Sequence, residues 1–153
     1  MSYIVHVKQV QARPIAAVRA RMAARDIPGR FRQSLDKVWK FLGYYPHLRG
    51  TGHNVFLYRH DMDEAGAMTI DFGVEVSQVF AAGGEVFCTT TPAGETASTV
   101  HRGPYAGLRA GHEAIRAWMT ANGREDGGWS WEIYGDWNDD PKKLETEILY
   151  LLR

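Results

Sequence analysis

Residues 95–123 read ETASTVHRGPYAGLRAGHEAIRAWMTANG, and this stretch predicts a β-strand that leads directly into an α-helix. Small and β-branched residues dominate the first part, and Gly103-Pro104 mark the helix start because proline fits the first helical turn. Gly123 is expected to end the helix. The stripe that faces a sheet consists of Leu108, His112, Ile115, Trp118 and Met119.

The first half of the chain shows the same order of elements. A strand is predicted at residues 15–23, and the helix after it starts at Asp26 and Pro28 and ends at Gly43. Each unit also has a strand before this pair and two strands after the helix. These strands are expected at about residues 3–11, 54–60 and 67–76, and at 86–91, 130–137 and 145–152.

Landmark residues of the two halves recur at a nearly constant offset. The pairs are Pro14 with Pro92, Trp39 with Trp118, Tyr58 with Tyr134, and Ile70 with Ile148. We therefore predict an α+β fold in which duplicated strand-strand-helix-strand-strand units form one antiparallel sheet around a pseudo-two-fold axis. The repeats span about residues 1–76 and 85–153 of a single 1–153 domain, with 77–84 as connector. A central ligand groove is expected where the two units meet.

One predicted strand, Trp129-Ser130-Trp131-Glu132-Ile133-Tyr134, places a carboxylate among large aromatic residues. Strand alternation puts Ser130, Glu132 and Tyr134 on one face, so Glu132 points either to solvent or into a cavity. In a cavity, the carboxylate must be paired, hydrogen-bonded or neutral. Such a site favours a bulky organic cation, because the charge is neutralised and each aromatic face adds about 0.5–2 kcal/mol.

Composition excludes several other functions. The chain has 18 basic and 18 acidic residues, so it shows no charge surplus that would indicate direct nucleic-acid or membrane binding. Its six histidines have no recognised ligand spacing, so neither a metal site nor a cofactor is expected. A single cysteine, no signal-peptide pattern and no long apolar segment predict a cytoplasmic protein.

A second motif, His101-Arg102-Gly103-Pro104-Tyr105, stands at the junction of strand and helix. If the sheet is shared, this helix start lies near the end of the strand that carries Glu132. The Tyr105 hydroxyl would then hydrogen-bond the carboxylate or a ligand. The alternative is that Tyr105 is a packing aromatic residue at the helix start.

With both motifs considered, the chain resembles the GyrI-like small-molecule-binding domain, the effector-binding module of AraC-type and MerR-type multidrug regulators. The resemblance also rests on Trp118, Asp140-Pro141 and Thr146-Glu147-Ile148-Leu149-Tyr150. It begins almost at residue 1, with no helix-turn-helix before it, and so implies a stand-alone member.

The resemblance implies that Glu132 lies at the bottom of an aromatic cleft for lipophilic cations, and that Tyr105 and Tyr134 match the family's tyrosines. Strand and helix faces add Trp39, Tyr58, Phe80 and Trp131 as candidate wall residues. The expected function is binding or sequestration of amphipathic, often cationic, aromatic molecules. One alternative is a hydrolase of reactive electrophiles, with Glu132 as general acid or base and Tyr105 orienting or donating. Another alternative is a gyrase-inhibitory protein. Either a monomer or a homodimer is compatible with these hypotheses.

Overall fold

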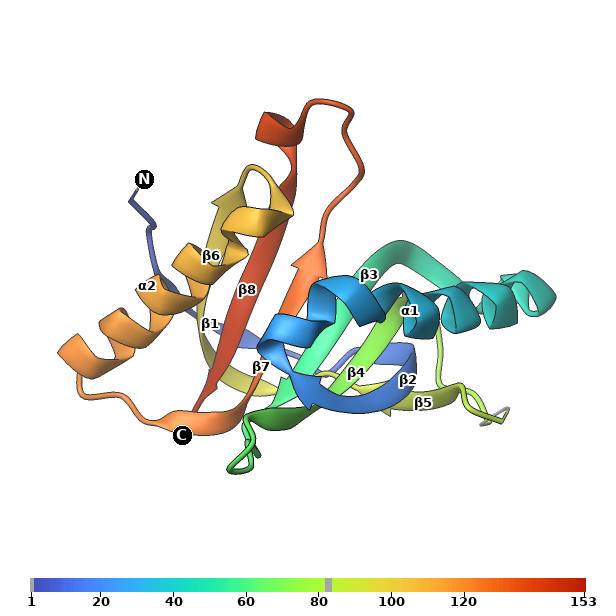
Figure 1. Ribbon diagram of the computed structural model, residues 1–153, viewed down its shortest axis with the longest axis horizontal. Coiled ribbons are helices and arrows are strands. Elements are labelled where there is room, and N and C mark those ends of the chain that lie inside the picture. Colours follow the sequence, from blue (N-terminus) through green and yellow to red (C-terminus); the bar gives the residue numbers. More distant parts are fainter. Residues whose placement is uncertain (1, 82–83) are drawn as a thin grey trace.

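Each half of the chain contributes four strands and one α-helix to this computed structural model, which describes residues 2–81 and 84–153 (Figure 1). The first half contains β1 (His6–Val10), β2 (Pro14–Ala23), α1 (Ile27–Tyr44), β3 (Arg49–Arg59) and β4 (Ala67–Val76). The second half contains β5 (Phe87–Thr90), β6 (Gly94–Arg102), α2 (Leu108–Ala121), β7 (Asp126–Tyr134) and β8 (Glu145–Leu152). Short 3-10 turns cover Ala24–Asp26, Pro46–Leu48, Tyr105–Gly107 and Pro141–Lys143.

All eight strands form one antiparallel sheet with the order β1-β6-β8-β7-β3-β4-β2-β5. The order is symmetric about its centre, where the equivalent strands β7 and β3 pair. The first strand of each half pairs with the other half, β1 with β6 and β5 with β2. The predicted α+β fold with a duplicated antiparallel sheet is confirmed. The repeat boundaries stay a prediction, and residues 82–83 of the connector lie outside the described residues.

Both helices cover the same face of the sheet, but over its two sides and not over its centre (Figure 1). The helix α1 packs on β2 and β4, and α2 packs on β6 and β8. Buried residues of the two helices are Leu35, Val38 and Leu42 on α1, and Gly111, Ile115 and Met119 on α2. Neither helix therefore makes its main contacts with the central strands β3 and β7.

The other face of the central strands carries a separate apolar cluster. Strand alternation places Leu57 of β3 and Trp131 of β7 there, and both are almost completely buried. They pack with Ile15, Ala17, Val55 and Leu149. The two faces of β7 thus differ: one packs against apolar residues, and the other is available for a site.

Helix ends deviate from the predicted ones for identifiable reasons. The α-helix in the second half starts at Leu108 and not at Pro104, because Tyr105–Gly107 form a 3-10 turn first. Helix α1 runs past Gly43 to Tyr44, since Gly43 does not take the positive φ of a helix-ending glycine. Asp26 occupies the N-cap position, but its side chain makes no capping hydrogen bond.

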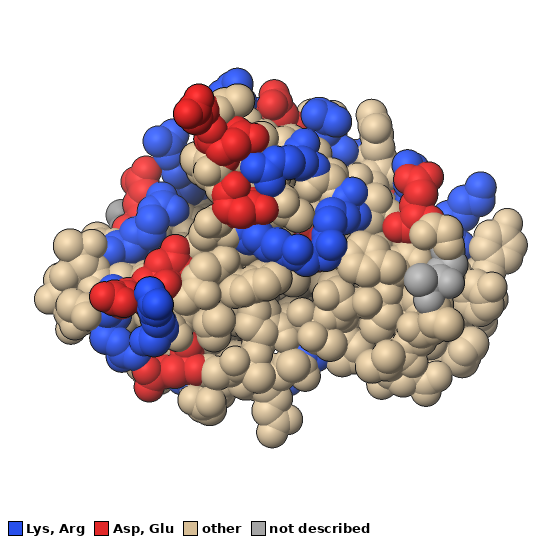
Figure 2. All heavy atoms as spheres, turned by 90° about the horizontal axis from the view of Figure 1, so that it is seen from below, with Lys and Arg blue, Asp and Glu red and all other residues tan. Residues whose placement is uncertain are grey.

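Charged side chains of both signs lie next to one another over one part of the face in Figure 2. This view shows no extended surface of a single sign. Among the described residues, neither helix has the length and apolar character that crossing a membrane requires. The same residues contain no group of three or more His, Cys, Asp or Glu side chains that could hold a metal ion.

Candidate functional site

A cavity of about 1610 Å³ lies between α1 and α2, above the central strands. Its volume exceeds the roughly 300–1,000 Å³ of a typical small-molecule site, so it has room for a sizeable organic ligand. The α1 side and the 3-10 turn before it contribute Ala24, Arg25, Ile27, Pro28, Phe31 and Leu35, and the α2 side contributes Leu108, Arg109, His112, Arg116, Met119 and Thr120. The floor includes Phe56, Tyr58, Ser130, Glu132, Tyr134 and Tyr150.

Glu132 lies on the cavity floor, with only 4% of its surface exposed. It sits on β7 opposite Phe56 of β3 and Ile148 of β8, near the centre of the sheet. The same strand alternation that buries Trp131 on the other face turns Glu132 toward the helices. Of the two orientations left open by the sequence, solvent or cavity, the structure shows the cavity.

Three side chains hydrogen-bond the Glu132 carboxylate. Tyr58 and Tyr134 both donate their hydroxyl protons to Oε1, each over 2.6 Å. His112 of α2 approaches Oε2 with its Nε2 atom, also at 2.6 Å. A carboxylate offers about four acceptor positions, so these bonds leave one position on Oε2.

The hydrogen-bonded path continues from His112 to two further residues. The Nδ1 atom of His112 lies 2.8 Å from the Tyr150 hydroxyl, and Arg116 donates to the same hydroxyl oxygen over 2.9 Å. We assign the protons along this path so that Arg116 donates to Tyr150, Tyr150 to His112, and His112 to Glu132. In this assignment His112 is neutral and Glu132 keeps a negative charge.

Burial and the carboxylate keep the floor tyrosines protonated. Burial raises the pKa of Tyr58 well above its ordinary value of 10.0, and the charge of Glu132 raises this pKa further. The pKa of Tyr134 is raised well above its ordinary value by the same two causes, in the same order. Both hydroxyls therefore act as donors at neutral pH, which matches their contacts with Oε1.

Two histidine–aspartate pairs mark the ends of the cavity. At one end, His53 Nε2 lies 2.9 Å from Asp136 Oδ1. At the other end, His60 Nδ1 lies 2.5 Å from Asp126 Oδ2, and its Nε2 lies 2.8 Å from Ser130 Oγ. Because His53 lies on β3 and His60 directly follows this strand, the cavity extends along the central strands from one pair to the other.

An aromatic cluster forms the wall beside Glu132. The rings of Phe56 and Tyr134 meet edge to face with centres 4.9 Å apart, and Phe31 lies 5.6 Å from Phe56. Tyr105 packs against Tyr134 at 5.3 Å and is 38% exposed at the rim. Partial burial raises the pKa of Tyr105 above its ordinary value. These rings give the cavity an apolar surface next to its carboxylate.

Four of the predicted ligand-contacting residues, Glu132, Tyr58, Tyr105 and Tyr134, line this cavity. Within the described residues, Tyr105 makes no hydrogen bond to Glu132. Its ring packs on Tyr134, and a hydrogen bond from its hydroxyl to a ligand stays a prediction.

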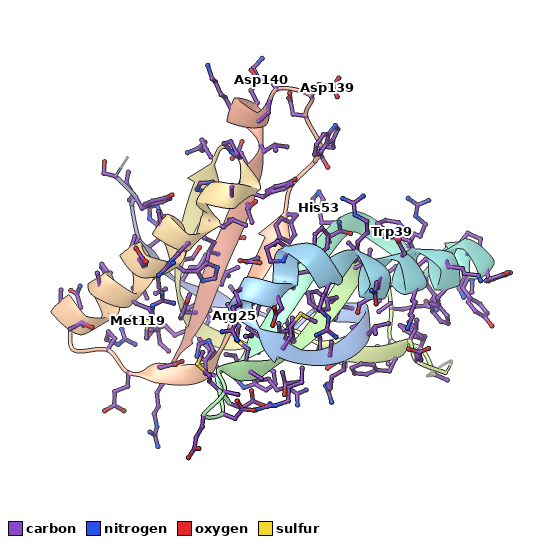
Figure 3. The ribbon with its side chains drawn as sticks, in the orientation of Figure 1. Arg25, Trp39, His53, Met119, Asp139 and Asp140 are labelled. Carbon is purple, nitrogen blue, oxygen red and sulfur yellow. The ribbon has the colours of Figure 1, made fainter. Side chains whose placement is uncertain are left out.

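The structure gives Trp39, Phe80 and Trp131 no place on the cavity wall. Trp131 faces the opposite side of the sheet. Trp39 lies one helical turn beyond the wall residue Leu35 and donates to Asn54 (Figure 3). The Phe80 ring packs beside Phe41 at 5.3 Å. The assignment of these three residues to the cleft is therefore not maintained.

Sequence reasoning missed His112, Tyr150 and Arg116 as site residues. The signal for His112 was present, because it is the polar member of an otherwise mostly apolar helix stripe that faces the sheet. Tyr150 shares its strand face with the buried Ile148. Arg116 follows His112 by one helical turn, but no pattern in the sequence connects it to Tyr150.

A family model for the GyrI-like small molecule binding domain matches residues 4–153. The chain belongs to this family. None of the curated proteins searched matches the sequence.

Solved structures with the fold of this GyrI-like domain include EcmrR, SAV2435 and a hydrolase from Listeria innocua. The C-terminal domain of EcmrR has a TM-score of 0.78 at 21% identity, and covers 100% of this chain and 99% of its own. EcmrR in complex with DNA has a TM-score of 0.81 at 20% identity. This match covers 99% of this chain but only 57% of EcmrR.

SAV2435 bound to tetraphenylphosphonium has a TM-score of 0.66 at 13% identity, with 100% of this chain and 94% of SAV2435 covered. The Listeria innocua hydrolase has a TM-score of 0.65 at 11% identity, and the match covers 97% of this chain and 91% of the hydrolase. At sequence identities this low, the TM-scores establish a shared fold and nothing further.

Proposed function

We propose that this GyrI-like domain binds amphipathic aromatic small molecules, many of them cationic, between α1 and α2. The observation that carries the proposal is the almost fully buried Glu132 carboxylate on the floor of a large cavity with aromatic walls. Tetraphenylphosphonium, the compound bound to SAV2435, has this combination of charge and aromatic surface. The role of Glu132 is that of charge partner.

The contacts around Glu132 support this role. All three groups that donate to the carboxylate are neutral in the assigned proton arrangement, so they stabilise the negative charge without cancelling it. One acceptor position on Oε2 stays available. The adjacent rings of Phe56 and Tyr134 offer a cation additional attraction of about 0.5–2 kcal/mol each.

A fluorescence titration tests the proposal with a cationic dye and a neutral dye of similar shape. Trp137 lines the cavity and reports its occupancy. Glu132→Gln should weaken binding of the cationic dye by about 1–3 kcal/mol and leave the neutral dye almost unaffected. Glu75→Gln is the matched control, because Glu75 is also a buried carboxylate but does not line this cavity. Equal affinity of wild type for both dyes would remove the charge-partner role.

A second candidate function is hydrolysis of reactive electrophiles in the same cavity. It is favoured by one observation: Glu132 contacts three proton-bearing groups, so a general base and general acids lie together. Tyr58, Tyr134 and His112 fit the donor role better than Tyr105, which does not reach the carboxylate. Hydrolysis of an aromatic epoxide, measured as diol formation, tests it. Glu132→Gln should abolish turnover while the neutral epoxide still binds.

Three other predictions rest on the sequence alone. A cytoplasmic location is checked by cell fractionation, and the choice between monomer and homodimer by analytical ultracentrifugation. A gyrase partner is checked by supercoiling assays with purified gyrase and added protein. Unchanged supercoiling at high protein concentration would exclude direct inhibition.

A further inference from the structure

The cavity contains more positive than negative side chains, although its best-buried charge is a carboxylate. Four arginines line it, together with three carboxylates. The arginines are Arg25, Arg109, Arg116 and Arg124, and the carboxylates are Asp126, Glu132 and Asp136. A site built only for lipophilic cations does not require arginines in its wall, because like charges repel a ligand.

Most of these charges already have partners. Arg109 pairs with Glu113, and Arg124 pairs with Glu95. Each of the three carboxylates contacts a histidine: Asp126 contacts His60, Asp136 contacts His53, and Glu132 contacts His112. Among the described residues, two of the four arginines are left without a carboxylate partner.

Arg25 and Arg116 are these two side chains. Within residues 2–81 and 84–153, neither has a carboxylate within ion-pair distance. Arg116 uses Nη1 to donate to the Tyr150 hydroxyl, and Arg25 makes no side-chain hydrogen bond to a described residue. A guanidinium has five N–H donors, so most donors of both residues remain available to a ligand.

The two arginines approach the cavity from opposite halves of the chain. Arg25 lies in the 3-10 turn before α1, and Arg116 lies on α2, one turn beyond His112. In Figure 3, Arg25 lies between the two helices, on the same lower side of the view as Met119, whereas His53 lies toward the top. The hydrogen-bonded path through His112 and Tyr150 separates Arg116 from Glu132.

We infer that Arg25 and Arg116 form an anion-accepting end of the cavity, and that the preferred ligands carry a carboxylate or similar oxyanion beside their aromatic, cationic body. Guanidinium groups bind such oxyanions through paired, charge-assisted hydrogen bonds. A zwitterionic ligand places its positive part near Glu132 and its anionic group near the arginines. The inference rests on the proposed function, and it narrows the ligand class from amphipathic cations to amphipathic zwitterions.

Two forms of one dye test this inference: a rhodamine with a free benzoate carboxylate and the methyl ester of the same rhodamine. They share the cationic xanthene body and differ only in the anionic group. For wild type, the acid should bind about tenfold more tightly than the ester. Arg116→Gln and Arg25→Gln should each weaken binding of the acid about threefold to tenfold and leave the ester within twofold.

Arg102→Gln is the matched control, because Arg102 is also an arginine at the surface, 68% exposed, but pairs with Glu145 and does not line the cavity. This variant should change neither affinity. Ester binding also reports whether Arg116→Gln folds correctly.

Equal affinity of wild type for acid and ester would overturn the inference while the proposed function survives. Equal losses of acid binding in all three arginine variants would also overturn it, because they indicate a general charge effect. Absence of binding for both dyes would overturn the proposed function and this inference with it.

Discussion

The two helices that border the cavity occupy equivalent places in a duplicated fold but present different chemistry. Helix α1 contributes the apolar side chains Ile27, Phe31 and Leu35, whereas α2 contributes His112 and Arg116. The central strands differ less than the helices. Each contributes one tyrosine, Tyr58 from β3 and Tyr134 from β7, and both donate to the same oxygen of Glu132. The duplication therefore forms the cavity, and the divergence of the halves makes the α1 helix side apolar and adds polar side chains to the α2 side.

The largest expected effect comes from breaking the apolar side. Phe72 of β4 is completely buried below α1, and its ring meets Phe56 edge to face with centres 4.8 Å apart. Phe72→Ala should lower the free energy of unfolding by about 3–5 kcal/mol, since it leaves a void in the core. Urea denaturation measures this loss. Phe80→Ala, which changes a half-buried phenylalanine in the segment after β4, should cost clearly less; equal losses would mean that the core is centred elsewhere.

Breaking the polar side should have a smaller effect on stability. His112→Phe removes the partner of Glu132 Oε2 and of the Tyr150 hydroxyl, so the free energy of unfolding should fall by about 1–3 kcal/mol. The control is His53→Phe, because His53 contacts the 95% exposed Asp136 and such surface pairs contribute about 0–1 kcal/mol. If both variants lose the same free energy in urea denaturation, the path through His112 does not stabilise the domain.

Tyr58 and Tyr134, one from each half, should make the free energy of unfolding depend on pH above pH 10. Above pH 10, the unfolded chain loses these phenolic protons, whereas the raised pKa values of Tyr58 and Tyr134 keep them bound in the folded state. Stability should therefore fall as pH rises, by about 1.4 kcal/mol per pH unit for each tyrosine. Denaturant unfolding at a series of pH values measures this slope. Tyr58→Phe should make it shallower, and an unchanged slope would assign the effect to other groups.

The smallest effect is expected at the cavity rim. The described residues offer the Tyr105 hydroxyl no hydrogen bond, while its ring packs on Tyr134. Tyr105→Phe should leave the free energy of unfolding within about 0.5 kcal/mol of wild type, and Tyr105→Ala should lower it by about 1 kcal/mol. Thermal unfolding compares the two variants. A larger loss for the Phe variant would indicate that the hydroxyl has a partner.

Sequence periodicity predicted the elements of this fold but not all of their pairings. The stripes of both helices and the alternation around Glu132 follow directly from helical and strand periods. These periods do not say which strands become neighbours, so the pairing of β1 with β6 and of β5 with β2 was not predicted. The repeat in the sequence indicated two equivalent units, and the structure adds that each gives its first strand to the other.

The candidate site shows where residue type misleads. Alternation already placed Trp131 on the face opposite Glu132, yet Trp131 was also included among the candidate wall residues. His112 lay on a recognised stripe, but its contact with Glu132 depends on how far α2 stands from β7, which no local pattern encodes. Periodicity thus predicted which way side chains point, while the distances that create chemistry depend on packing.

The crossed placement of β1 and β5 bears on how the chain reaches its native state. The Thr96 hydroxyl donates to the Lys8 carbonyl across 88 residues, and Tyr3 contacts His101 across 98. During synthesis, β1 can pair only after β6 has been made. The first half therefore leaves the ribosome with one edge of β2 unpaired until β5 follows. Contacts this distant along the chain slow folding, and the domain should acquire its structure late and as one cooperative unit.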